Sequence, residues 1–268
     1  MTHYEEIKTG TVFFIGAGPG APDLITLRGQ RLIERAACII YAGSLVNPTL
    51  FAGCKAPLHD SAGLHLAEIV ELMVNTCRAG GDVARVHTGD PCLYGAIKEQ
   101  MAALDEASIK YEIVPGVSSA FGAAAALEAE LTLPEVSQSV IITRRGGRTP
   151  VPEAESLASF AAHRSTMVIF LSVAMIDEVV SELTGGGYEQ HTPVSVVMKA
   201  TWPDQKIVTG TLADIAEKVR TENITKTALI CVGQVFGQTP LRALSKLYDK
   251  TFSHAARNSI DGDRDETI

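Results

Sequence analysis

Residues 12–29 of the chain read VFFIGAGPGAPDLITLRG. The stretch begins with a run of large apolar residues, has glycines at positions 16, 18 and 20, and continues with helical spacing. It therefore predicts a strand over 11–15, a tight turn, and a helix over 24–35. Glycines at the carboxyl end of a strand let a ligand approach the backbone closely, at the edge where open α/β sheets bind ligands.

The glycine turn by itself has three interpretations. It resembles the dinucleotide-binding pattern G-x-G-x-x-A when Gly16, Gly18 and Ala21 are counted. Against this, Pro19 and Pro22 remove two backbone donors from the turn, and the next predicted strand ends in Ala-Gly rather than in an acidic residue. A tight turn that binds no ligand is the second interpretation, and a turn that binds another ligand is the third.

The same arrangement of strand, turn and helix occurs twice more. Residues 83–95 read VARVHTGDPCLYG, and residues 114–120 read VPGVSSA. Asp90-Pro91 also fits a plain helix N-cap followed by proline at the first helical position. Three such turns in one half of the chain predict ligand-facing groups along one sheet edge.

Short β-branched runs alternate with helical stripes along most of the chain, which predicts βαβ units. We expect an N-terminal α/β domain over 1–117, a C-terminal α/β domain over 118–240, and a polar, partly disordered tail over 241–268. The sheets should be mostly parallel or mixed. The predicted strands are Thr11–Ile15, Ala37–Tyr41, Val83–His87, Lys110–Val114, Ser139–Thr143, Thr166–Leu171, Pro193–Met198, Lys206–Val208 and Ala228–Val235.

Composition excludes several classes of protein. The 268 residues carry a net charge of −8, so the chain lacks the field that attracts nucleic acid. Its five cysteines are odd in number and never form a C-x-x-C pair, which favours reduced thiols and argues against a zinc cluster. No apolar run reaches the length of a membrane span, and the first residues do not resemble a signal peptide. We expect a cytoplasmic protein with no nucleic-acid or membrane partner and no metal site.

Residues 12–29 and 83–95, in this order and at this spacing, resemble the two signature motifs of the tetrapyrrole (corrin/porphyrin) methyltransferase family. The VPGVSSA turn fits the same template, so the resemblance reaches about residue 237. It implies a homodimeric enzyme of two α/β domains with the active-site cleft between them. It also implies S-adenosyl-L-methionine as methyl donor, released as S-adenosyl-L-homocysteine, and a tetrapyrrole polycarboxylate as acceptor.

Residues 41–48 and 143–152 are most similar to the branch that methylates carbon 11 of precorrin-4, or of cobalt-precorrin-4, in cobalamin biosynthesis. The uroporphyrinogen III branch instead has an Asp where this chain has Ala42, and a lysine that is absent from 59–63. The alternatives are another tetrapyrrole methyltransferase, an NAD-dependent oxidoreductase, and a cofactor-binding module without catalytic activity.

The resemblance also implies site residues. A carboxylate at Asp90 would bind the cofactor, complement its positive charge and serve as the catalytic candidate. A polycarboxylate substrate needs cationic side chains at its binding site. The arginine run within 143–152 is a candidate for this role, although such a run is equally typical of a solvated surface. Arg85 is a weaker candidate. Trp202 would either line a pocket or pack in a core. The implied cofactor contacts are Pro19, Thr88, Gly89, Asp90, Leu93, Ser118, Ser119, Leu171, Ala200 and Ala228, and the implied substrate contacts are Arg144, Arg145, Arg148 and Lys199.

Overall fold

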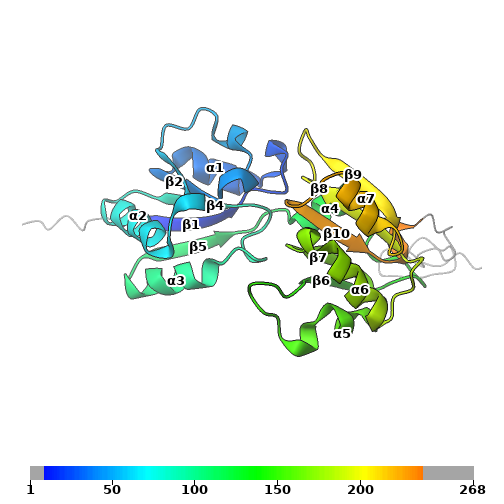
Figure 1. The fold of residues 1–268 in the computed structure, drawn as a ribbon. Helices are drawn as coiled ribbons and strands as arrows, with labels where there is room; N and C mark the ends of the chain where they lie inside the picture. The colour runs from blue at the N-terminus through cyan, green and yellow to red at the C-terminus, as the bar shows by residue number, and fades with distance from the viewer. Residues whose placement is uncertain (1–8, 238–268) are drawn as a thin grey trace, which may run out of the picture. The chain divides into compact units, whose positions relative to one another are not determined.

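A computed structural model describes residues 9–237 (Figure 1). The chain forms two compact units. Within the described residues, unit 1 comprises 9–127, Val197–Ile207 and Ile224–Leu229, and unit 2 comprises Glu128–Val196, Val208–Asn223 and 230–237. The predicted tail over 241–268 lies outside the described residues, and the division at 117 stays a prediction.

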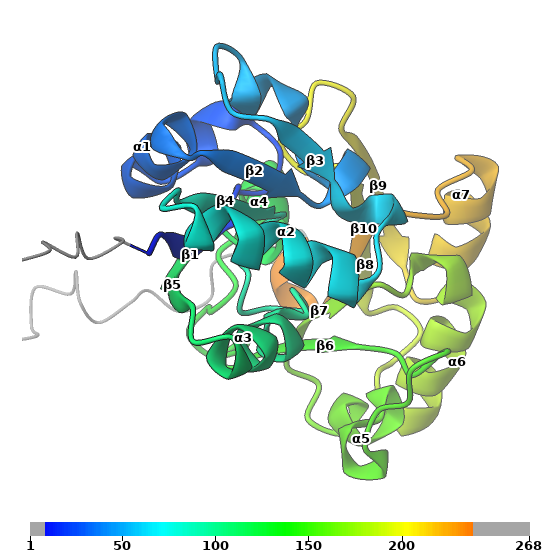
Figure 2. The same ribbon diagram turned by 90° about the vertical axis from the view of Figure 1, so that its left-hand side faces the viewer.

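Unit 1 is built on a five-stranded sheet with the order β3-β2-β4-β1-β5. All of its strand pairs are parallel, as the alternation of strands and helices predicts (Figure 2). Residues 12–15 are fully or nearly fully buried, because β1 lies between two other strands and is covered on both faces. The strands are β1 (Thr11–Gly16), β2 (Cys38–Tyr41), β3 (Leu58–Asp60), β4 (Val83–His87) and β5 (Lys110–Val114).

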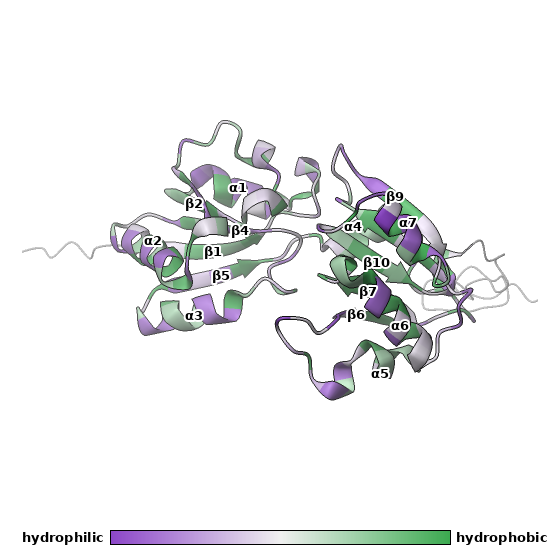
Figure 3. Ribbon diagram, viewed as in Figure 1, coloured by the Kyte–Doolittle hydropathy of each residue, from purple (hydrophilic) through white to green (hydrophobic). Residues whose placement is uncertain are grey.

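Side chains alternate between two cores, one on each face of this sheet. Phe14 packs in the core formed with α2 and α3, whereas Ile15 packs in the core formed with α1. Hydrophobic residues dominate the strands, and the helices carry both hydrophobic and hydrophilic stretches (Figure 3). The helices of unit 1 are α1 (Leu27–Arg35), α2 (Leu66–Arg78), α3 (Ile97–Glu106) and α4 (Ser119–Ala126).

The second sheet is mixed and has the order β6-β7-β10-β8-β9. β6 and β7 are parallel, whereas β7 and β10 are antiparallel. Gly187, at φ 131°, is the C-cap of α6, a position at which glycine is common because it tolerates positive φ. The elements are β6 (Val140–Arg144), β7 (Thr166–Phe170), β8 (Pro193–Met198), β9 (Lys206–Thr211), β10 (Ala228–Val232), α5 (Leu157–Ala161), α6 (Ile176–Gly186) and α7 (Ile215–Thr221).

The structure differs from the sequence-based predictions at a few places. The prediction of a helix that starts at Pro91 is wrong, because residues 91–94 form a turn and α3 begins at Ile97. The helix expected from Leu24 begins at Leu27, capped by the Thr26 side chain. The short edge strand β3 was not predicted. Within 9–237, no helix is long and apolar enough to cross a membrane.

Candidate functional site

The three glycine-containing turns meet at one edge of the unit 1 sheet. They follow β4, β1 and β5, which are neighbours, so their carboxyl ends lie side by side. Gly18 and Gly89 form an isolated antiparallel bridge: the Gly89 N–H donates to the Gly18 carbonyl at 2.8 Å, and the Gly18 N–H donates to the Gly89 carbonyl at 3.2 Å. The convergence predicted from the sequence is confirmed.

Glycine is required where these turns touch. A Cβ on Gly116 would lie 2.2 Å from the Gly89 carbonyl oxygen, and one on Gly16 would lie 2.6 Å from the Gly116 Cα. Gly89 also has φ +61°, which side chains rarely allow. The result is a cradle of backbone without side chains, here called the glycine cradle (Gly16, Gly18, Gly89 and Gly116). Such a cradle suits a ligand recognised by main-chain groups, as the resemblance implies for S-adenosyl-L-methionine.

Asp90 joins two of the turns. Its Oδ1 accepts a hydrogen bond from the Cys92 N–H at 2.8 Å, and its Oδ2 accepts one from the Gly116 N–H at 2.9 Å. Asp90 therefore starts a turn rather than capping an α-helix. Because each carboxylate oxygen has two lone pairs, the half-buried Asp90 can still accept a bond from a ligand.

The turn after Asp90 carries two further features. Leu93 is half-buried, and its N–H donates to the Asp90 carbonyl at 3.2 Å. Cys92 is exposed, and the pKa of its thiol is raised by partial burial and by the neighbouring Asp90 carboxylate. This thiol is therefore not activated as a nucleophile.

Two buried polar residues lie on β4 just before the turn: Arg85, expected from the sequence only as a weaker substrate contact, and His87, for which the sequence predicted no role. Arg85 is 5% exposed, and burial lowers its pKa to about 10. His87 is 4% exposed, and burial together with the nearby Arg85 charge lowers its pKa to about 3, so it is neutral at physiological pH. The signal that could have found them is two basic residues, two positions apart, in an otherwise apolar strand.

The third turn leads into α4. The Ser118 hydroxyl caps this helix by accepting from the Ala120 N–H at 3.3 Å. A Cβ on Gly89 would lie 3.3 Å from the Ser119 nitrogen, so the two serines adjoin the cradle. The structure thus brings Thr88, between His87 and Gly89, to the same edge as Ser118 and Ser119.

A segment from late in the chain packs on the first turn. Thr201 Oγ1 accepts from the Ala21 N–H at 2.9 Å, and Trp202 Nε1 donates to the Pro19 carbonyl at 3.1 Å. The indole lies against Gly20, where a Cβ would come within 2.1 Å of its Cδ1. Of the two interpretations of Trp202, the structure therefore favours packing.

Three other site candidates, Lys199, Ala200 and Ala228, lie in the late segments of unit 1. Ala200 and Ala228 are buried. Lys199 donates through Nζ to Asp204 Oδ2 at 2.5 Å, and the same nitrogen lies 5.6 Å from the centre of the Trp202 ring. Because an ammonium group has three donors, this bond still leaves donors for a substrate carboxylate.

The remaining candidates lie in unit 2, after the parallel strands β6 and β7. Arg144 donates to the Thr149 and Pro150 carbonyls at 2.9 Å each, and Arg145 donates to Glu182 Oε1 at 2.7 Å. Arg144 therefore shapes the loop that follows it, and Arg145 ties this loop to α6. Arg148 is exposed. Leu171 directly follows β7, is 70% exposed, and has φ 54°, an unusual combination for a leucine.

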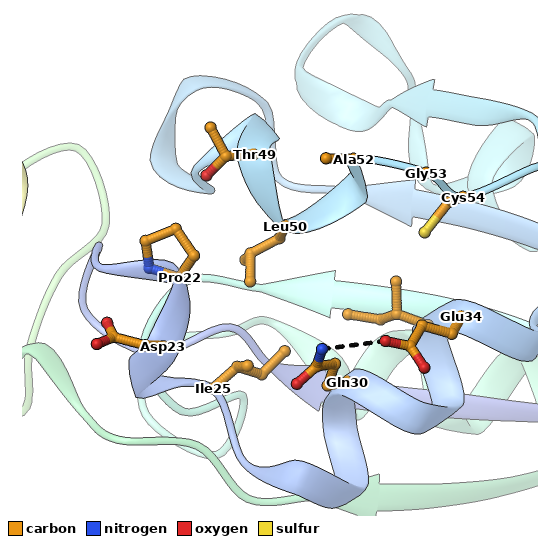
Figure 4. A pocket seen from close by; sticks show the side chains of 11 residues that line it. Pro22, Asp23, Ile25, Gln30, Glu34, Thr49, Leu50, Ala52, Gly53 and Cys54 are labelled. Carbon is orange, nitrogen blue, oxygen red and sulfur yellow. Dashed lines mark hydrogen bonds between the residues drawn. The ribbon is translucent and has the colours of Figure 1, made fainter.

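Unit 1 contains a pocket of about 530 Å³ (Figure 4). Its lining comes from η1 (Pro22–Leu24), α1, η3 (Pro48–Phe51) and the residues around them. It contains the carboxylates Asp23 and Glu34 but no lysine, arginine or histidine, and none of the predicted site residues. An anionic substrate would be repelled there.

Comparison with known proteins decides the family. A sequence model of the tetrapyrrole (corrin/porphyrin) methylases matches residues 11–216. The chain belongs to this family. It is 57% identical over 250 residues to a cobalt-precorrin-4 C(11)-methyltransferase of Methanocaldococcus jannaschii, covering 92% of this chain and 96% of that protein. It is 52% identical over 248 residues to a precorrin-4 C(11)-methyltransferase of Pseudomonas aeruginosa, covering 92% and 98%.

Solved structures of tetrapyrrole methylases share the fold. A cobalt precorrin-4 methyltransferase of cobalamin biosynthesis matches with a TM-score of 0.83 and 49% identity, over 85% of this chain and 96% of that one. A uroporphyrin-III C-methyltransferase of Thermus thermophilus, complexed with S-adenosyl homocysteine, matches with a TM-score of 0.73 and 27% identity, over 84% and 98%. The two-unit α/β architecture predicted from the sequence is confirmed.

Proposed function

We propose that the chain is an S-adenosyl-L-methionine-dependent methyltransferase that methylates carbon 11 of precorrin-4 or cobalt-precorrin-4 in cobalamin biosynthesis. The observation that carries the proposal is the identity of more than half of the residues with two proteins of that name, over more than 90% of each chain. The glycine cradle supports it, because it offers backbone where the family motifs lie.

S-adenosyl-L-methionine supplies an activated methyl group when bound. Methyl transfer from a sulfonium needs no covalent enzyme intermediate, so the protein has to align the two reactants and exclude water. In this proposal the carboxylate of Asp90 complements the sulfonium charge while its two backbone bonds keep it in place. The residues proposed to contact the cofactor are Pro19, Thr88, Gly89, Asp90, Leu93, Ser118, Ser119, Leu171, Ala200 and Ala228.

The acceptor carries several carboxylates, so we propose that cations of the chain orient it. The exposed Arg148 can bind a carboxylate without giving up an existing partner. Arg144 and Arg145 hold the loop that carries it, and either can contribute a second contact, as can Lys199 through the donors that its bond to Asp204 leaves. We also propose that the enzyme is cytoplasmic and forms a homodimer. Light scattering after size-exclusion chromatography tests the dimer.

Calorimetric titration with S-adenosyl-L-homocysteine and, separately, with NAD tests the cofactor. We expect binding of the first and none of the second. Binding of NAD alone would instead favour an oxidoreductase.

Incubation with precorrin-4 and with its cobalt complex, followed by mass spectrometry and NMR, tests the substrate. We expect one added methyl group, at carbon 11, from whichever of the two is the true substrate. Methylation of uroporphyrinogen III while neither precorrin-4 form reacts would move the chain to another branch of the family.

A further inference from the structure

The turn over 91–96 holds an unfavourable backbone conformation. Tyr94 and Ala96 have φ values of 56° and 49°, and neither is glycine. The turn is also tight, since a Cβ on Gly95 would lie 2.2 Å from the Pro91 carbonyl oxygen. L-residues disfavour the left-handed region, so such a turn persists only where the surrounding structure holds it. It contains Leu93 and directly follows Asp90, both proposed to contact the cofactor.

The two ends of the turn are held differently. At the start, Asp90 binds the amides of Cys92 and Gly116. At the end, Gln100 donates through Nε2 to the Ala96 carbonyl at 3.0 Å, and its Oε1 accepts from Arg85 Nε at 3.0 Å. Because arginine has only donors, Arg85 fixes the orientation of the Gln100 amide: its oxygen faces the guanidinium and its NH₂ group faces Ala96.

Arg85 is an unusual residue for this position. It is 5% exposed, and within the described part of the chain no carboxylate lies within ion-pair distance of it. Its other hydrogen bond within residues 9–237 is a long one of 3.5 Å, from Nη1 to the Ile40 carbonyl at the end of β2. Burying a guanidinium without a counter-charge lowers the stability of the fold. A shorter or apolar side chain would avoid this cost, but it would not supply the rigid, planar set of donors that arginine has.

We propose that Arg85 and Gln100 form a buried brace that holds the 91–96 turn in the conformation that binds S-adenosyl-L-methionine. Both are positioning residues, because they act through the turn and touch no reactant. The inference rests on the proposed function, and it replaces the weaker interpretation of Arg85 as a substrate contact. A guanidinium enclosed by strands β2 and β4 and helix α3 has no surface to offer a substrate carboxylate.

Two variants of the full-length chain test the brace. Gln100→Glu keeps the size and an acceptor for Arg85 and adds a counter-charge, but its ionised carboxylate cannot donate to Ala96. Arg85→Met keeps most of the length and removes every donor. We expect each to raise the calorimetric Kd for S-adenosyl-L-homocysteine by about tenfold or more, and to speed amide hydrogen exchange in 91–96. If Arg85→Met fails to fold, Gln100→Glu alone decides.

Thr166→Val is the matched control. Thr166 is fully buried in unit 2, and its hydroxyl donates to the Leu131 carbonyl at 2.8 Å, so its loss lowers stability without touching the turn. We expect its Kd to stay within about twofold of wild type. Wild-type binding by both brace variants, or equal weakening in the control, would overturn the inference. A wild-type chain that fails to bind S-adenosyl-L-homocysteine would overturn the proposed function itself, and the inference with it.

Discussion

At the scale of single residues, His87 makes stability depend on pH. Its pKa is about 3 in the folded chain, against about 6.5 when exposed, because burial and Arg85 disfavour the imidazolium. Between these values only the unfolded chain binds the proton, so stability is complete above about pH 6.5 and falls with decreasing pH by about 1.4 kcal/mol per unit. We expect a loss of about 2 kcal/mol from this residue at pH 5.

Urea unfolding at pH 7.5 and pH 5 measures this contribution. His87→Leu should lose less stability between the two pH values than the wild type does, because it has no imidazole to protonate on unfolding. Thr166→Val, which removes a buried hydroxyl and no titratable group, should keep the wild-type difference. The same acid sensitivity in His87→Leu and wild type would show that other groups cause it.

Asp90 joins two turns and is proposed to bind the cofactor, and these two roles can be separated. Hydrogen bonds to a charged group contribute about 1.5–3 kcal/mol, so Asp90→Asn, which keeps the size but loses one acceptor oxygen, should lower the free energy of unfolding measurably. We expect its affinity for S-adenosyl-L-homocysteine to fall further than this instability explains. Calorimetry and urea unfolding of the same preparation give both numbers.

Asp60→Asn is the control for Asp90→Asn. Asp60 also accepts a backbone N–H two residues on, from Ala62 at 2.8 Å, but it bridges to no second turn. Its variant should bind the ligand as the wild type does. If Asp90→Asn binds equally well, Asp90 is only a connector of the two turns.

At the scale of elements, the glycine cradle predicts a sharp contrast between two glycines. Gly116→Ala would place a methyl group 2.2 Å from the Gly89 carbonyl and so force the turns after β4 and β5 apart. We expect it to cost more than about 2 kcal/mol and to abolish calorimetric binding of S-adenosyl-L-homocysteine. Gly63→Ala, which has open space around it, should change stability by less than about 0.5 kcal/mol. Ligand binding by Gly116→Ala at wild-type strength would exclude the cradle as the site.

Most, but not all, helices and strands could be predicted from the sequence. Runs of β-branched residues predicted most strands correctly, because a buried strand has a recognisable apolar sequence. β3 has no such sequence, since it is short and lies at the edge of the sheet, with two of its three residues exposed. Asp90-Pro91 is a good local helix start, yet Asp90 Oδ2 binds the Gly116 amide, 26 positions away. Similarly, no local pattern pairs Arg85 with Gln100. Contacts between distant residues decide these points, and single-sequence patterns do not contain them.

At the scale of the whole molecule, the chain returns to unit 1 after passing through unit 2. Residues 197–207 and 224–229 belong to unit 1, and the Ala21 amide binds Thr201, 180 positions away. Sequence patterns predicted two successive domains, because such patterns indicate where strands and helices lie along the chain. They do not indicate that a late segment packs on an early turn. The first turn, where the cofactor site is proposed, is therefore packed by residues from late in the chain.

This return predicts that residues 1–127 alone will not bind the cofactor. Without Thr201 and Trp202, the Ala21 amide, the Pro19 carbonyl and the surface over Gly20 lose their partners. In the full chain, Trp202 is the only tryptophan, so its fluorescence reports this packing directly. S-adenosyl-L-homocysteine at 100 times its Kd should stabilise that fluorescence transition in urea by about 2.7 kcal/mol. The fragment should show no such shift by circular dichroism, and binding by the fragment at full strength would mean that the late segments are dispensable for the site.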